Sequence, residues 1–188
     1  MKIFDFTEKR YGIYDPAERC GFMARTSSMP SRKLCPEKLQ FTEQGAVMPP
    51  CPKLSYEKNA NDFDFGGFCF RIDVPGPGAY HLEVELSSLS DAARIAVNGT
   101  HPEQIAQEGW WDAAQLIPRI HTASWKDHVW TFAYVCGGRS LEIEVEPASP
   151  KLTVAVRRIN VSALPQAAPG AVPALYTLGD STVKSYVY

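Results

Sequence analysis

The chain has 188 residues, of which 45% are hydrophobic and 21% charged, a composition typical of a globular protein with one main domain. Its formal net charge is −2, so it lacks the excess of Lys and Arg by which proteins bind nucleic acid or anionic membranes, and neither partner is expected. Residues 1–6 reach Asp5 before an apolar run can form, so we expect no signal peptide, and no stretch has the length of a membrane span.

The cysteines are odd in number and none of them are spaced as Cys-x-x-Cys. This usage argues against a closed disulfide framework and against a zinc knuckle. We therefore expect reduced thiols, a cytoplasmic protein, no metal site and no cofactor. The cysteines are Cys20, Cys35, Cys51, Cys69 and Cys136.

Residues 7–62 are the least regular part of the chain, because prolines recur throughout them, and we expect long loops with a few short strands. Residues 68–74 then alternate apolar with polar side chains, as a half-buried strand does, and residues 80–86 repeat the pattern. Four turn residues, Pro75-Gly76-Pro77-Gly78, separate the two runs. This arrangement predicts a β-hairpin.

Two further strands are predicted in the middle of the chain. Residues 94–97 are apolar enough for a short strand, and Asn98-Gly99 after them is a turn signal. In residues 129–136 both faces are apolar or aromatic, which predicts a strand covered on both sides, with Trp130 in the core.

The last two predicted strands alternate clearly. Residues 141–146 alternate aliphatic side chains with Glu142, Glu144 and Glu146, which predicts one face in the core and an acidic face in water. A paired-carboxylate acid and base site is the alternative interpretation of these glutamates and of Glu83 and Glu85. Residues 152–161 alternate likewise, but the phase slips at Arg157-Arg158, which predicts a bulge.

Helical periodicity is weak throughout, whereas short strands recur with frequent turn residues, so the predicted fold class is all-β. The predicted architecture is an antiparallel β-sandwich of jelly-roll type over residues 1–162. Residues 163–174 repeat Pro and small residues, as a semi-rigid linker does. Residues 175–188 then form a separate segment after this linker.

Residues 176–183 read Tyr-Thr-Leu-Gly-Asp-Ser-Thr-Val, in which a short apolar run leads into Gly179-Asp180-Ser181-Thr182. This segment resembles the opening block of SGNH (GDSL-type) hydrolases. The whole chain is similar to the N-terminal part of bacterial rhamnogalacturonan acetylesterases, in which a galactose-binding-like β-sandwich precedes an α/β catalytic domain. The looser segments Phe70-Arg71-Ile72-Asp73-Val74 and Val97-Asn98-Gly99 also resemble such sandwich domains.

The resemblance implies that Ser181 is the nucleophile, that its N–H is an oxyanion donor, and that Gly179 and Asp180 shape the turn. A serine nucleophile also needs an activating base, which this family takes from a later Asp-x-x-His. Every His lies upstream of Ser181 and none follows an Asp by three positions. We therefore expect the chain by itself to be inactive, and residues 175–188 to be the start of a truncated SGNH domain, with the missing C-terminal catalytic domain as a partner.

Trp110 and Trp111 are candidate carbohydrate contacts, because two adjacent residues of a strand cannot both face inward. The predicted function is an N-terminal accessory, carbohydrate-directed domain of a serine esterase that acts on acetylated polysaccharide. One alternative is a stand-alone carbohydrate-binding module. The other is a purely structural or interaction β-sandwich.

Overall fold

The computed structural model describes residues 1–27, 32–50, 63–64, 67–90, 93–99, 120–126, 128–147 and 152–165. Within these ranges the regular structure is almost entirely strand, so the predicted all-β class is confirmed. The strands are β1 (Lys2–Asp5), β2 (Cys20–Phe22), β3 (Arg32–Lys33), β4 (Gln40–Thr42), β5 (Gly45–Met48), β6 (Phe63–Asp64), β7 (Phe68–Asp73), β8 (Gly78–Leu86), β9 (Ala93–Val97), β10 (Ile120–Lys126), β11 (Val129–Cys136), β12 (Ser140–Pro147) and β13 (Val154–Ala163). The short 3-10 helices are η1 (Pro36–Lys38) and η2 (Ser88–Ser90).

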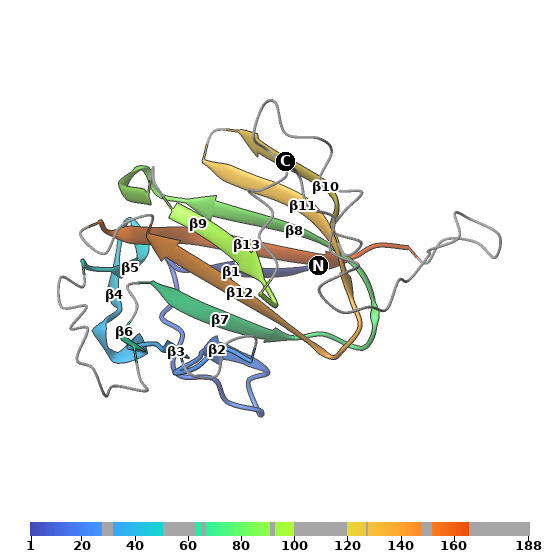
Figure 1. The fold of residues 1–188 in the computed structure, drawn as a ribbon, viewed down its shortest axis with the longest axis horizontal. Helices are drawn as coiled ribbons and strands as arrows, with labels where there is room; N and C mark the ends of the chain where they lie inside the picture. Colours follow the sequence, from blue (N-terminus) through green and yellow to red (C-terminus); the bar gives the residue numbers. More distant parts are fainter. Residues whose placement is uncertain are drawn as a thin grey trace, which may run out of the picture.

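The described strands form two antiparallel sheets and one short parallel pair (Figure 1). The larger sheet has seven strands in the order β10-β11-β8-β13-β5-β4, and β1 also pairs with β13. The smaller sheet has four strands in the order β2-β7-β12-β9. Strands β3 and β6 form the parallel pair. Strand β13 is central because β8 lies along one of its edges while β5 and β1 follow each other along the opposite edge.

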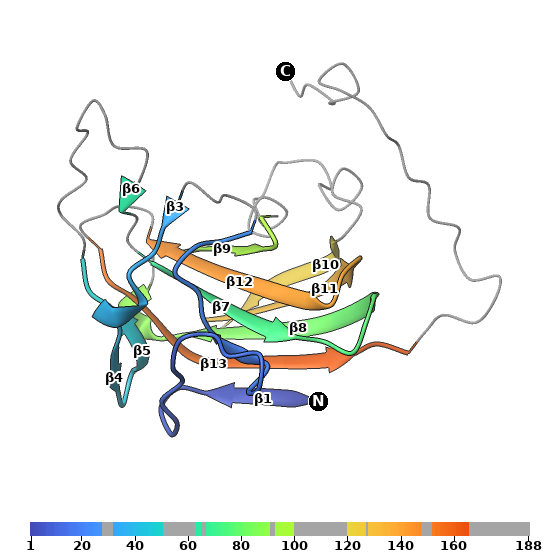
Figure 2. The ribbon, with the colours of Figure 1, turned by 90° about the horizontal axis from the view of Figure 1, so that it is seen from below.

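One hydrophobic core serves both sheets. Figure 2 shows the strands of these sheets from a second direction. Because side chains alternate along a strand, β8 contributes every second residue to the core, from Tyr80 to Leu86. Phe70 and Ile143 enter from the smaller sheet, while Leu82 and Ile159 enter from the larger one, and all four are fully buried. Aromatic rings from the N-terminal region join them, with Phe6 and Phe70 edge to face at 5.1 Å between ring centroids.

The predicted hairpin of residues 68–74 and 80–86 is wrong, although both strands exist. Strand β7 pairs with β2 and β12, whereas β8 pairs with β11 and β13 in the other sheet. The Pro/Gly segment between them therefore connects the two sheets. The alternation shows only that each strand buries one of its faces. Two strands that lie in facing sheets satisfy this pattern as well as two strands of one hairpin do.

Other strand predictions are confirmed with one adjustment. The pairing of β13 with β8 shifts between Val156 and Arg158, where the bulge was predicted. Strand β9 ends in a turn at Asn98 and Gly99. Trp130 lies in the core, as predicted. On the outward face of β11 Ala133 is buried, but Val129, Thr131 and Val135 are only partly buried, so this strand is not fully covered on both faces.

The predicted linker and serine block fall mainly outside the described residues. Leu164 donates its backbone N–H to the carbonyl of Ala79 at 2.8 Å, so the chain stays beside β8 just after β13. No helix in the described ranges has the length and hydrophobicity that a membrane crossing requires. Cys20, Cys35, Cys69 and Cys136 are not joined to one another by disulfide bonds, while Cys51 lies outside these ranges.

Candidate functional site

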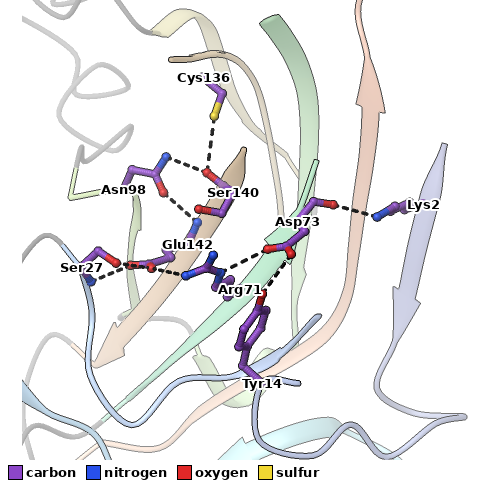
Figure 3. Close-up of polar contacts among 9 residues, drawn as sticks. All are labelled: Lys2, Tyr14, Ser27, Arg71, Asp73, Asn98, Cys136, Ser140 and Glu142. Atoms are coloured by element: carbon purple, nitrogen blue, oxygen red, sulfur yellow. Dashed lines mark hydrogen bonds and ion pairs between the residues drawn. The ribbon is translucent and has the colours of Figure 1, made fainter. Parts of the chain in front are cut away.

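The site residues predicted from the sequence are not placed by the structure. Gly179, Asp180 and Ser181 lie outside the described residues, and so do Trp110 and Trp111. The described part of the chain instead contains a cluster of polar side chains on the outer face of the smaller sheet. We call it the Arg71 cluster, and its members are Tyr14, Ser27, Arg71, Asp73 and Glu142 (Figure 3).

The strand register explains why these side chains meet. Phe70 and Ile72 of β7 face the core, so Arg71 and Asp73 face outward. On the neighbouring strand β12, Glu142 is directly opposite Arg71. Directly opposed residues of an antiparallel pair share one face of the sheet, which brings the guanidinium beside the carboxylates.

The guanidinium of Arg71 is held from two sides. Its Nε donates to Oδ1 of Asp73 at 3.2 Å, and its central carbon lies 4.5 Å from the centre of the Tyr14 ring. The Tyr14 hydroxyl donates to Oδ2 of Asp73 at 2.9 Å. Loss of hydration, together with this hydrogen bond, raises the pKa of the Tyr14 hydroxyl above its ordinary 10.

Glu142 is buried, which contradicts the prediction that the acidic face of its strand lies in water. Its side chain is 2% exposed, and Glu144 is also buried. Ser27 donates both its backbone N–H and its hydroxyl to Glu142, at 2.7 and 2.5 Å. The segment that carries Ser27 runs beside β7, where Met23 donates its N–H to the carbonyl of Cys69. Alternation identifies which side chains share a face, but it does not show that another segment covers that face.

Glu83 and Glu85 lie on the outer face of the larger sheet and do not form a catalytic pair. Glu83 accepts a hydrogen bond from Nδ2 of Asn160 at 2.7 Å. Glu85 forms ion pairs with Arg157 at 3.3 Å and with Arg158 at 2.7 Å. Each carboxylate is therefore engaged by a neighbour on β13, so the acid and base alternative has no geometric support there.

Asn98 secures the edge of the smaller sheet beside the cluster. Its φ of 48° and the φ of 77° at Gly99 form the left-handed turn that the Asn-Gly pair predicted. Its side chain accepts from the N–H of Glu142 at 2.8 Å and donates to the carbonyl of Ser140 at 3.3 Å. The thiol of Cys136 also donates to that carbonyl, at 3.4 Å. These contacts are structural, since they tie the end of β9 to β12.

The carboxylates of the Arg71 cluster act as hydrogen-bond acceptors. Both oxygens of Glu142 and both oxygens of Asp73 accept hydrogen bonds within the cluster, which leaves neither carboxylate arranged as a general base. Within the described residues, no three His, Cys, Asp or Glu side chains are grouped so that they could hold a metal ion. What faces solvent is a fixed arginine beside a fixed aspartate, with side-chain exposures of 28% and 20%.

Sequence reasoning did not select these residues as a site. The alternation in residues 68–74 placed Arg71 and Asp73 on one outward face, and that was the available signal. The pairing of Arg71 with Glu142, and the approach of Tyr14, depend on strand order across more than half the chain. Neither can be deduced from local patterns.

No protein-family model and no curated protein matches the chain. Among solved structures, the chain is similar to the crystal structure of the protein YxiM from Bacillus subtilis, with 15% sequence identity and a TM-score of 0.47. The match covers 87% of this chain and 40% of that chain. The chain thus spans about two fifths of the length of the protein that it matches.

Proposed function

We propose that residues 1–162 form a galactose-binding-like β-sandwich that serves as the N-terminal accessory domain of an SGNH-type serine esterase. The substrate class is an acetylated polysaccharide. The observation that carries the proposal is the segment Leu178-Gly179-Asp180-Ser181-Thr182-Val183, which follows a Pro/Ala-rich stretch after the β-rich region. The two antiparallel sheets around one core agree with the accessory part of this proposal.

In the proposed esterase Ser181 attacks the carbonyl carbon of an acetyl ester. The sugar hydroxyl leaves, an acetyl group remains on the serine oxygen, and water then releases acetate and restores the hydroxyl. A turn that starts a helix presents unpaired backbone N–H groups, and the N–H of Ser181 would be one donor to the oxyanion. In this proposal the base that activates Ser181 is the His of an Asp-x-x-His pair, and residues 1–188 do not contain such a pair.

The first test is the coding sequence past Tyr188. The proposal predicts an Asp-x-x-His pair within about two hundred further residues, the size of one additional domain. The second test is acetate release from acetylated rhamnogalacturonan by the longer protein and by its Ser181→Ala variant. Loss of release in the variant supports the proposal, whereas release at the unchanged rate, or the absence of an Asp-x-x-His pair, contradicts it.

A second candidate function is a carbohydrate-binding module that works without an enzyme. The partly exposed pairing of Arg71 with Asp73 favours this candidate, since such a pair offers hydrogen-bond donors and acceptors to a sugar. Calorimetric titration of residues 1–165 with sugars separates the candidates when it is combined with the acetate assay. Sugar binding without any acetate release by the longer protein selects the module over the esterase.

A further inference from the structure

We propose that Arg71, Asp73 and Tyr14 form a binding site for a neutral saccharide that presents two neighbouring hydroxyl groups (Figure 3). The inference rests on the carbohydrate part of the proposed function and not on Ser181. It assigns sugar recognition to the outer face of the smaller sheet, formed by residues of β7 and by the N-terminal segment, instead of to Trp110 and Trp111.

The donors come from the guanidinium. An arginine has five N–H groups in a planar fork. The Nε–H donates to Asp73, while Nη1 lies 3.9 Å from Oε1 of Glu142, a distance that is too long for a hydrogen bond. The side chain is 28% exposed. Its terminal N–H groups are therefore available to the oxygen of an incoming hydroxyl.

The acceptors come from Asp73. Each of its carboxylate oxygens accepts one hydrogen bond, from Arg71 or from Tyr14, and a carboxylate has about four acceptor positions in all. The side chain is 20% exposed, so the remaining positions can be reached from solvent. A sugar with two adjacent hydroxyls can accept from Arg71 with one oxygen and donate to Asp73 with the other.

The three side chains are fixed before a ligand arrives. The ring of Tyr14 covers one face of the guanidinium, and the Tyr14 hydroxyl fixes the second oxygen of Asp73. Lys2 donates to the backbone carbonyl of Asp73 at 2.8 Å, which ties β1 to the end of β7. Binding to groups that are already ordered costs less conformational entropy than binding to free side chains.

The charges around the site favour a neutral ligand. Two cations, Arg71 and Lys2, lie beside two carboxylates, Asp73 and Glu142, so their formal charges cancel. A uronic acid would bring its carboxylate next to the carboxylate of Asp73, and the two like charges repel each other. A neutral hexose makes the same hydroxyl contacts without that repulsion.

The experiment titrates ¹⁵N-labelled protein of residues 1–188 with D-galactose, L-rhamnose and D-galacturonate and follows the backbone amides and the arginine Nε–H groups by NMR. We expect saturable shifts at the Arg71 Nε–H and at the amides of β7 with the two neutral sugars. Galacturonate, which shares the ring hydroxyls of galactose, should bind no more tightly than galactose. The absence of saturable shifts with both neutral sugars, or tighter binding of galacturonate, would overturn the proposal.

Variants connect binding to the cluster. Arg71→Lys keeps the charge but loses the planar fork, and we expect binding to weaken about tenfold. Arg158→Lys is the matched control, because Arg158 also pairs with a strand carboxylate, Glu85, but on the other sheet. Should Arg71→Lys fail to fold, Tyr14→Phe preserves the ring stack, frees one Asp73 oxygen and is expected to weaken binding to a smaller degree. Equal affinity in the cluster variant and the control would contradict the assignment.

Discussion

Glu142 of β12 accepts hydrogen bonds from both the N–H and the hydroxyl of Ser27, although 115 residues separate the two positions in the chain. The contact fastens the N-terminal segment to the outer face of the smaller sheet, and Arg71 adds its charge beside the same carboxylate. Residues before Ser27 therefore belong to the folded unit instead of forming a loose extension. Their loss should weaken the sheet as well as remove Tyr14 from the Arg71 cluster.

Replacing Glu142 tests this contact. Glu142→Ala removes a buried acceptor of two hydrogen bonds and leaves Arg71 with one carboxylate, so the free energy of unfolding should fall by about 2 kcal/mol. Urea denaturation measures the change. Glu43 is exposed in the turn between β4 and β5, and Glu43→Ala should alter stability by about 0.5 kcal/mol or less. Equal effects of the two substitutions would show that the burial of Glu142 has no energetic role.

Gly45 provides a test of the larger sheet. Its φ is +97°, and a Cβ atom at this position would collide with the backbone carbonyl of Val156. Gly45→Ala should therefore destabilise the protein by about 3 kcal/mol through strain and displacement of β13. Gly137→Ala is the control, since a Cβ there meets nothing within 4 Å. Thermal and urea unfolding of both variants should separate them clearly, and a tolerated Gly45→Ala would contradict the pairing of β5 with β13.

Asp5 gives a prediction about pH. The Thr7 hydroxyl donates to Oδ1 of Asp5 at 2.6 Å, and this bond, more than the backbone N–H groups of Thr7 and Glu8, lowers the pKa of Asp5 below its ordinary 3.8. Because the pKa is lower in the folded state, the stabilisation is complete above pH 3.8 and is lost as pH falls through the folded value. NMR titration of the Asp5 carboxyl should give a midpoint below 3.8. Thr7→Ala should move that midpoint upward, and an unchanged midpoint would contradict the assignment.

Cysteine labelling tests the burial pattern. Cys20 is partly exposed, whereas Cys35, Cys69 and Cys136 are buried. Burial raises the pKa of the Cys20 thiol, so its reaction with a disulfide reagent should be slow at neutral pH and accelerate above pH 9. In a Cys51→Ser background, native protein should react at Cys20 first, and the other three should react only on unfolding. Early modification of Cys69 or Cys136 would show that the core is open.

The strands themselves could be predicted from sequence, because the alternation of apolar and polar residues that identifies a half-buried strand can be seen within a short segment. The alternation in residues 68–74 and 141–146 gave β7 and β12 to within a residue or two, and the slip at Arg157-Arg158 gave the shift in β13. These features depend on neighbours along the chain. The same holds for the turn at Asn98, whose φ of 48° suits asparagine.

Strand partners and covered faces could not be predicted, because they depend on distant segments. The Pro/Gly residues before β8 are compatible both with a hairpin turn and with a connection to another sheet. The sequence pattern of Glu142 and Glu144 is typical of a solvated face, but both are buried and Ser27 donates a hydrogen bond to Glu142. For the same reason the candidate site needed structure, since Tyr14 reaches Asp73 from 59 positions earlier in the chain.

We propose that Ser181 is the nucleophile of an esterase for which residues 1–162 are the accessory domain. The most direct measurement is reaction of the longer protein, continued past Tyr188, with a fluorophosphonate, followed by mass spectrometry of the peptide that contains Ser181. We expect one covalent adduct on Ser181, its loss in Ser181→Ala, and no adduct in residues 1–188 alone. An adduct on another serine, or none in the longer protein, would contradict it.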